Sequence, residues 1–183
     1  MTEDEYVATL SNSKRFEFRD GIISAKRGPY MTLLQHVVTA TEFGMALYEY
    51  RKIRGGFSGQ TPTVNLSGGD RRIYLIPDIA LWAAGRAIGN GIFTPPTLAI
   101  ELVSPDRSVR DLREKCVLYR TTGVDVAWLA HPEQCWVEVW EDLRNGERVE
   151  RTGVLESPHL PGLRIDLEQL FATIDSEATK LDG

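Results

Sequence analysis

The chain has 183 residues, a net charge of −5 and a pI of about 5.3, with 42% hydrophobic and 26% charged residues. This length favours one domain over residues 1–183, and the composition excludes global disorder. The chain contains no run of 18 apolar residues, so the sequence predicts no membrane-spanning helix. The acidic balance is unusual for a tight nucleic-acid binder, although a site that holds divalent cations is itself acidic.

The cysteines and the N-terminus predict a cytoplasmic location. Cys116 and Cys135 form no C-x-x-C motif, and two such cysteines suit a reducing compartment as buried free thiols. Three of the first five residues are acidic, and the apolar segment that a secretory signal needs does not follow them. We therefore expect a cytoplasmic protein without a membrane segment.

The first half of the chain predicts a hairpin, a long helix and two strands. Residues 16–25 alternate around Asp20-Gly21, which is a strong hairpin signal. From Thr32 to Ile53, apolar residues recur at helical spacing, and Gly55-Gly56 ends the helix. We expect next two strands and then a loop rich in glycine and proline, at Thr63–Leu66, Arg72–Trp82 and Ala83–Pro96.

The second half predicts a buried strand, a helix and further strands. Thr97–Val103 is apolar and bounded by Pro-Pro and Ser-Pro, which is typical of a strand buried on both faces. Val109–Thr121 predicts a helix. Three strands and a short helix complete the chain, at Val124–Ala130, Trp136–Glu141, Glu147–Leu155 and Leu167–Ile174. The core order αβββαβ indicates an α/β or α+β domain on a mixed sheet with flanking hairpins.

Two acidic residues lie inside apolar strands. Asp78 falls within the strand that ends at Trp82, and Glu101 falls within Thr97–Val103. Buried carboxylates are almost always paired or bound to a cation, so two on neighbouring strands can form one site. With a backbone carbonyl, for which Leu102 is the candidate, they would suit Mg²⁺ or Mn²⁺. Without metal, their repulsion is expected to raise the pKa of at least one.

The helix after Glu101 presents a lysine toward the same region. Asp111, Lys115 and Tyr119 are spaced by four residues and share one helix face. Lys115 could orient or deprotonate a water molecule, or neutralise a developing anion. Tyr119 is expected to border this space. Asp111 is expected to hold the helix register or to bind Arg110 or Arg113.

The same residues allow plainer interpretations. Asp78, Glu101 and Lys115 could form a buried ion-pair network without catalytic function. The arginines at 107, 110 and 113 could form a basic patch, but a solvated surface explains them better. The four tryptophans fall on predicted strands, where core packing explains them better than base stacking.

The order of several motifs resembles the PD-(D/E)xK nuclease superfamily, and more narrowly the bacterial Uma family of predicted endonucleases. The central motifs are PDIAL, LAIELVSPD and DLREKCVLYRTTGVDVAWLAHP. FEFRDGII resembles the opening hairpin of the family, and HLPGLRIDLEQLF resembles its closing strand and helix. The resemblance covers a core of about residues 14–172 and implies a restriction-endonuclease-like fold.

The resemblance also implies roles for individual residues. Asp78 would be the aspartate of the PD motif and Glu101 the acid of the (D/E)xK motif. Val103 occupies the usual lysine position, so this chain departs from the superfamily pattern, and Lys115 would supply the lysine from the following helix. Glu17 and His36 lie where the family tends to carry Glu and His. For Glu17 a strand-face charge is an equal alternative, and for His36 a surface or core histidine is favoured.

These observations predict a hydrolase: a Mg²⁺- or Mn²⁺-dependent endonuclease that cleaves DNA phosphodiester bonds. A homodimer would suit this function, because cutting both strands of a duplex needs two sites. One alternative is an inactive nucleic-acid- or protein-binding module, which the acidic charge and Val103 favour. Another is a self-associating structural protein on the same fold.

Overall fold

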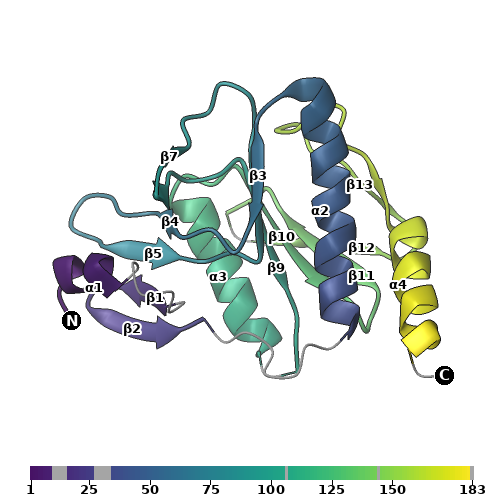
Figure 1. The fold of residues 1–183 in the computed structure, drawn as a ribbon, viewed down its shortest axis with the longest axis horizontal. Helices are drawn as coiled ribbons and strands as arrows, with labels where there is room; N and C mark the ends of the chain where they lie inside the picture. The colour runs from purple at the N-terminus through teal and green to yellow at the C-terminus, as the bar shows by residue number, and fades with distance from the viewer. Residues whose placement is uncertain (10–15, 27–33, 106, 144, 182–183) are drawn as a thin grey trace.

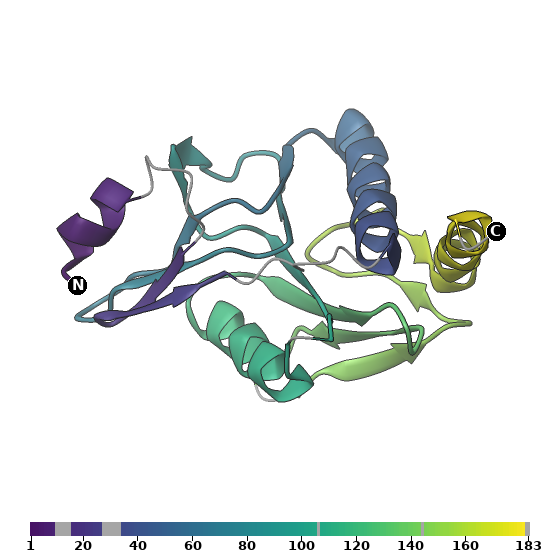
Figure 2. The same ribbon diagram turned by 60° about the horizontal axis from the view of Figure 1, so that its bottom comes forward.

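The computed structural model describes residues 1–9, 16–26, 34–105, 107–143 and 145–181. Within these ranges the chain forms helices that flank two larger sheets and one small sheet (Figure 1). The helices are α1 (Glu3–Thr9), α2 (Leu34–Arg54), α3 (Val109–Thr121) and α4 (Leu167–Leu181). Helix α1 and the first hairpin lie at the opposite end of the molecule from α4 (Figure 2).

The larger core is built on a mixed six-stranded sheet. Its strands, in spatial order, are β12 (Glu147–Glu150), β11 (Trp136–Trp140), β10 (Val126–His131), β9 (Leu98–Leu102), β6 (Ile79–Trp82) and β3 (Phe57–Gln60). Only β9 and β10 pair in parallel among these strands, and α3 connects them. The chain order α2, β3, β6, β9, α3, β10 confirms the predicted αβββαβ core.

A second six-stranded sheet contains the N-terminal hairpin. Its strands, in spatial order, are β2 (Ile22–Ala25), β1 (Phe16–Arg19), β5 (Ile73–Leu75), β4 (Val64–Asn65), β8 (Ile92–Phe93) and β7 (Gly89–Asn90). The hairpin prediction at residues 16–25 is thus confirmed. The predicted first core strand was wrong, because Thr63–Leu66 contributes β4 to this sheet and β3 takes the core position.

The predicted single strand Arg72–Trp82 is two strands in two different sheets. Strand β5 ends at Leu75 in the sheet of the hairpin, and β6 begins at Ile79 in the core sheet. Pro77 lies between them, and a proline cannot donate a hydrogen bond to a strand ladder. The backbone N–H of Asp78 then donates to the Ile100 carbonyl at 3.0 Å. The break therefore places Asp78 at the start of β6, beside β9.

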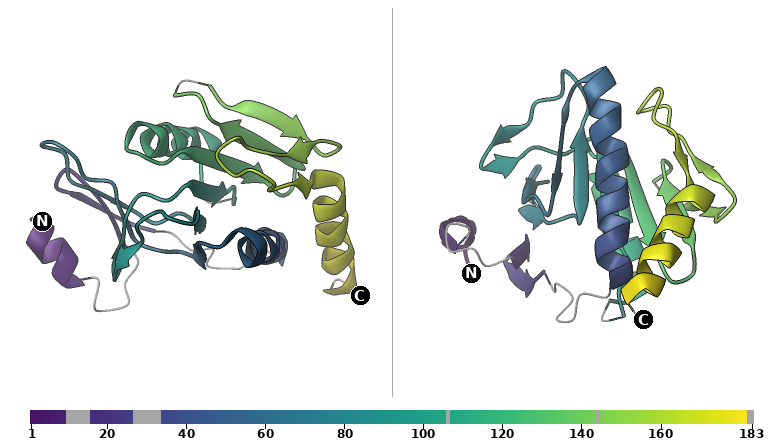
Figure 3. Two further views of the ribbon diagram at one scale, coloured as in Figure 1. Left: turned by 90° about the horizontal axis from the view of Figure 1, so that it is seen from above. Right: turned by 45° about the vertical axis from the view of Figure 1, so that its right-hand side comes forward.

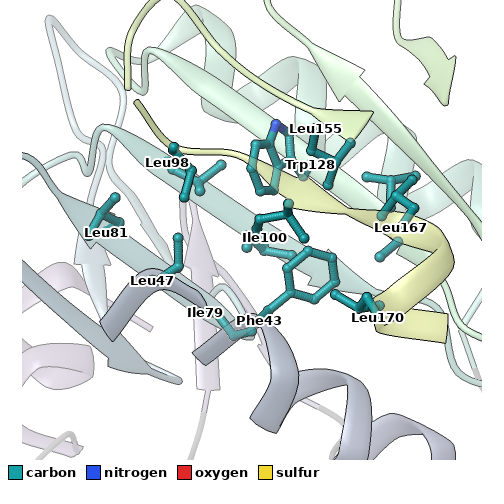
Figure 4. Close-up of a cluster of buried hydrophobic side chains, with 14 of the residues drawn as sticks. Phe43, Leu47, Ile79, Leu81, Leu98, Ile100, Trp128, Leu155, Leu167 and Leu170 are labelled. Atoms are coloured by element: carbon teal, nitrogen blue, oxygen red, sulfur yellow. The ribbon is translucent and has the colours of Figure 1, made fainter. Parts of the chain in front are cut away.

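The core sheet separates two hydrophobic layers, which decides where Glu101 points. Leu98, Ile100 and Leu102 pack with residues of α2 and α4, as Figure 4 shows for the first two. Ala99 belongs to the other layer, with Leu112, Cys116 and Tyr119 of α3. Figure 3 shows α3 and α2 on opposite sides of the sheet. Because strand residues alternate between faces, Glu101 lies on the α3 side of the sheet.

Several boundaries differ from the sequence-based expectation. Helix α1 and the β7–β8 hairpin were not predicted, the latter within a predicted loop. The predicted strand Glu147–Leu155 divides at a turn into β12 and β13 (Val154–Leu155), and β13 pairs with β14 (Ile165–Asp166). Helix α4 continues past Ile174, and the first two residues predicted for the long helix, 32 and 33, lie outside the described residues.

Other expectations can be compared directly with the structure. Cys116 is buried, Cys135 is partly buried, and both are free thiols. Each of the four tryptophans is buried, as core packing requires. In the described part of the chain, no helix is both long and apolar enough to cross a membrane.

Candidate active site

Charged side chains from both sheets and from α3 meet in one cluster. Glu17 comes from β1, and Lys26 directly follows β2. Asp78 precedes β6, Glu101 lies on β9, and Lys115 lies on α3.

Strand alternation explains why Glu17 faces the cluster. Its neighbours Phe16 and Phe18 pack with Tyr6 and Tyr74 on one face of the hairpin sheet. Glu17 therefore points to the opposite face, where it accepts a hydrogen bond from the Ile76 backbone N–H at 2.9 Å. The carboxylate of Glu17 is therefore buried beside Ile76, in the connection between β5 and β6.

Lys115 connects two of the carboxylates. Its Nζ lies 2.5 Å from Glu17 Oε1 and 2.6 Å from Glu101 Oε1, and it donates to the Ile76 carbonyl at 3.2 Å. An ammonium group has three hydrogen-bond donors, so these three oxygens use all of them. Lys115 therefore holds Glu17, Glu101 and the β5–β6 connection in fixed relation.

Lys26 bridges the other pair of carboxylate oxygens. Its Nζ lies 2.9 Å from Asp78 Oδ1 and 3.3 Å from Glu101 Oε2, and it donates to the Ile76 carbonyl at 2.6 Å. Since both carboxylates contact one nitrogen, they are closer together than the roughly 8 Å beyond which they could not share ions. Their predicted convergence is therefore observed.

Arg107 and Tyr119 complete the surroundings of Glu101. Arg107 Nη1 lies 3.1 Å from Glu101 Oε2 and 3.7 Å from Asp78 Oδ2. The Tyr119 hydroxyl donates to Glu101 Oε1 at 2.7 Å. Burial and then the negative charge of Glu101 raise the pKa of Tyr119 well above its ordinary value, so the hydroxyl remains a donor.

The cations decide the ionisation of Glu101. Burial on its own would raise the pKa of this carboxyl group, but Lys115, then Lys26 and then Arg107 hold the pKa well below its usual range. The expectation that repulsion between the carboxylates raises a pKa is therefore wrong for Glu101. The neighbouring cations, which the expectation underestimated, outweigh the effect of burial on the pKa of Glu101.

The two lysines respond differently to the same cluster. Burial lowers the pKa of Lys115, and the opposing effects of Glu101 and Glu17 are insufficient to restore it. Burial also acts on Lys26, but Glu101 and Asp78 together raise the pKa of Lys26 above its ordinary value. Lys26 is thus the more strongly stabilised cation of the two.

A cavity of about 450 Å³ opens onto the cluster. Among its described lining residues are Glu17, Lys26, Arg107 and Lys115, whereas neither Asp78 nor Glu101 is among them. Glu101 is fully buried. Lys26 and Arg107 therefore separate the cavity from the carboxylate oxygens that they contact.

The oxygen atoms around Lys26 are chemically suited to a divalent cation. Asp78, Glu101 and the Ile76 carbonyl offer three hard oxygen atoms to one position, and an ammonium group fills that position. The described residues contain no cluster of three or more His, Cys, Asp and Glu side chains arranged to hold a metal. The fit to Mg²⁺ or Mn²⁺ therefore depends on two carboxylates and one backbone carbonyl, and the Lys26 ammonium group stands in for the ion at that position.

The remaining predicted residues lie apart from this position or contact it differently. Leu102 presents its backbone N–H, which donates to Asp78 Oδ2 at 2.8 Å, while a role for its carbonyl stays a prediction. Asp111 is exposed and lines the cavity. The arginines expected to bind it pair with other residues, Arg110 with Glu114 and Arg113 with Glu138.

One residue considered from the sequence, His36, lies away from the site, and two residues of the site, Lys26 and Arg107, were not predicted. His36 lies on α2, which packs on the opposite face of the core sheet from α3. Lys26 was not predicted, because a lysine after an exposed strand looks like a surface residue. Arg107 was considered only for a basic patch. The nearest signal was the short spacing between Arg107 and Glu101, six residues apart.

Comparison with known proteins identifies the family of this chain. A family model described as "Putative restriction endonuclease", Uma2, matches residues 3–174. The chain belongs to the Uma2 family. The family resemblance inferred from the motifs is thereby confirmed. The description of this family is that of a nuclease.

The fold of this Uma2 protein is also found among solved structures. It is similar to a protein from Anabaena variabilis ATCC 29413 described as "a putative nuclease belonging to DUF820", with a TM-score of 0.77 and 21% sequence identity. The match covers 95% of this chain and 99% of that chain. At this identity the likeness establishes the fold alone. Among curated proteins, none matches this chain.

Proposed function

We propose that this Uma2 protein is a metal-dependent endonuclease that hydrolyses DNA phosphodiester bonds at the cluster around Glu101. The observation that carries the proposal is the convergence of Asp78 and Glu101, from two neighbouring strands, on one position beside a cavity. Buried carboxylates on adjacent strands are costly unless a cation compensates them. A nuclease family supplies the corresponding substrate class.

The residues of the cluster have different proposed roles: binding the metal ion, positioning Glu101 and attracting the phosphate group. Asp78 and Glu101 would hold a divalent cation, which would stabilise negative charge on the phosphate during hydrolysis. Lys115 and Tyr119 act as positioning residues, since both donate hydrogen bonds to Glu101 Oε1. Arg107 lines the cavity and would attract the phosphate group.

A cleavage assay tests this function. Purified protein is incubated with supercoiled plasmid and with single-stranded DNA, in Mg²⁺, Mn²⁺ or EDTA. We expect cutting in metal and none in EDTA, and a loss of about 10²-fold or more in Glu101→Gln, as for removal of a charge-stabilising group. Cutting that survives both EDTA and Glu101→Gln would contradict the proposal.

A structural ion-pair network is the second candidate. One observation favours it: three carboxylates, Glu17, Asp78 and Glu101, already meet three cations, Lys26, Arg107 and Lys115. The inner cluster is therefore neutral without a metal. Arg19, at the rim, adds a longer contact of 3.9 Å to Glu17.

Lys115→Ala separates the two candidates through two readouts. In an enzyme, cleavage slows by about 10²-fold, while metal can still neutralise Glu101 and preserve the fold. In a structural network, the variant loses about 3–5 kcal/mol of stability and the parent never cuts. Cleavage rate and denaturant midpoint are measured together, with the exposed Lys52→Ala as a control. A folded variant that cuts as fast as its parent would remove Lys115 from the mechanism.

A further inference from the structure

Lys26 lies at the position that a metal ion would need. Three oxygens surround its Nζ within 3.3 Å: Asp78 Oδ1, Glu101 Oε2 and the Ile76 carbonyl. The first two belong to the proposed metal ligands. A divalent ion at its usual ligand distance of about 2.0–2.6 Å cannot share these oxygens with a positive nitrogen, because like charges at such short separation repel strongly.

The position of the cavity supports the same conclusion. Lys26 lines the cavity, whereas Glu101 is fully buried and contacts Lys26 from the other side. Asp78 and Glu101 are not among the described lining residues, whereas Lys26, Arg107 and Lys115 are. An ion arriving from the cavity therefore meets these cations, Lys26 among them, before it can reach Asp78 or Glu101.

The charges indicate what must move when metal enters. With Lys26 and Arg107 in place, the inner cluster is neutral, so a divalent ion would add two uncompensated charges. If these two side chains withdraw, one divalent ion restores the balance. Lys115 does not have to leave, because it contacts neither Asp78 Oδ1 nor Glu101 Oε2; its carboxylate partners are Glu17 Oε1 and Glu101 Oε1.

We propose that Lys26 is a tethered cation that occupies the metal position and must withdraw before a divalent ion binds Asp78 and Glu101. This inference rests on the proposed function, because it takes these two carboxylates as the metal ligands. It makes metal occupancy a competition between the ion and a side chain of the same protein. Lys26 thereby sets the metal concentration at which the site is filled.

Titration of the full chain with Mn²⁺ tests the competition, with free ion followed by electron paramagnetic resonance. Lys26→Met and Lys26→Gln are compared with the parent. We expect the Kd for Mn²⁺ to fall by about tenfold or more in both variants, the scale on which groups around a metal site alter affinity. The gain should disappear when Asp78→Asn is added, because the ion then loses a ligand.

Two matched controls separate competition from a general charge effect. Lys52→Met removes a lysine from the exposed surface of α2 and is expected to leave the Kd unchanged. Lys115→Met removes the second buried lysine but leaves Lys26 in the metal position, so its gain should be several-fold smaller. An equal gain in Lys115→Met would overturn the specific role of Lys26.

The remaining outcomes distinguish this proposal from the proposed function. If parent and Lys26→Met bind Mn²⁺ equally, and Asp78→Asn abolishes binding in both, the metal site stands and Lys26 does not compete. If no variant binds Mn²⁺ through Asp78, the proposed function fails and this inference fails with it. If both Lys26 variants fold only when Mn²⁺ is present, the ion has replaced the Lys26 ammonium group in the cluster. If they fail to fold even with Mn²⁺, the ion does not replace that group, which contradicts the proposal.

Discussion

Among the individual residues, Glu101 has the central position in the charged cluster. Its carboxylate is fully buried, and Lys115, Lys26, Arg107 and Tyr119 all contact it. A single buried carboxylate surrounded by so many donors stays ionised because its partners compensate the loss of water. The free energy of this arrangement therefore depends on the charge of Glu101.

This dependence predicts how stability changes in acid. The folded-state pKa of Glu101 lies below its ordinary value of 4.5, chiefly because Lys115 and Lys26 outweigh burial. A lowered folded pKa contributes stability that is present above the unfolded pKa and is lost as the pH falls through the folded pKa. The stability advantage of the parent over Glu101→Gln should therefore be largest near neutral pH and shrink below about pH 4.5.

Urea denaturation across the range from about pH 7 to about pH 3 measures this difference. Glu114→Gln, which changes an exposed acid on α3, is the matched control and should change little. A difference between parent and Glu101→Gln that stays constant over the whole range would mean that Glu101 is not held ionised by its neighbours.

Individual residues also show how far the sequence could lead. Asp78 and Glu101 stood out because acidic residues in apolar strands need a partner, and Lys115 and Tyr119 followed from helical spacing. Lys26 could not be found in this way, because it reaches a carbonyl 50 positions away and a carboxylate 75 positions away. Such contacts depend on how two sheets meet, which spacing along one element does not encode.

At the scale of elements, the junction at Ile76-Pro77-Asp78 organises the site. The Ile76 carbonyl binds both lysines, its N–H binds Glu17, and Asp78 opens β6. The mostly apolar segment Arg72–Trp82 was predicted as a single strand, and Pro77 was the available sign of a break. Helix α3 was predicted with its observed bounds, because a long amphipathic segment between clear stops is a strong local signal.

Strand β3 supports this junction from the sheet edge. Its pairing with β6 depends on Gly56, which adopts a φ of +99°, and an added Cβ there would overlap the Trp82 carbonyl oxygen. Gly56→Ala should therefore lower the free energy of unfolding by about 2 kcal/mol or more beyond the cost of the positive φ alone. The thermal and denaturant midpoints measure this loss.

Gly21→Ala provides the matched comparison. Gly21 has a similar φ of +92°, but an added Cβ there meets nothing within 4 Å. This variant should therefore show the strain of a positive φ without the overlap. Equal losses in Gly21→Ala and Gly56→Ala would mean that the contact between Gly56 and β6 does not constrain the edge of the core sheet.

At the scale of the whole molecule, two sheets and α3 enclose one charged cluster in an otherwise acidic protein. The net charge of −5 gives no general attraction for DNA, so arginines and lysines around the cavity would have to supply it locally. The αβββαβ order could be predicted from the clear local patterns of α2, β9, α3 and β10, although its first strand was assigned to Thr63–Leu66 and not to β3. The second sheet could not, since it is assembled from short strands far apart in sequence.

Diffraction from crystals of the full chain soaked in Mn²⁺ locates the metal position, because the anomalous scattering of manganese identifies the ion. We expect one ion bound to oxygens of both Asp78 and Glu101 at about 2.0–2.6 Å, with the Lys26 ammonium displaced from them. An ion bound elsewhere, or Lys26 still bridging the two carboxylates at saturating Mn²⁺, would contradict this expectation.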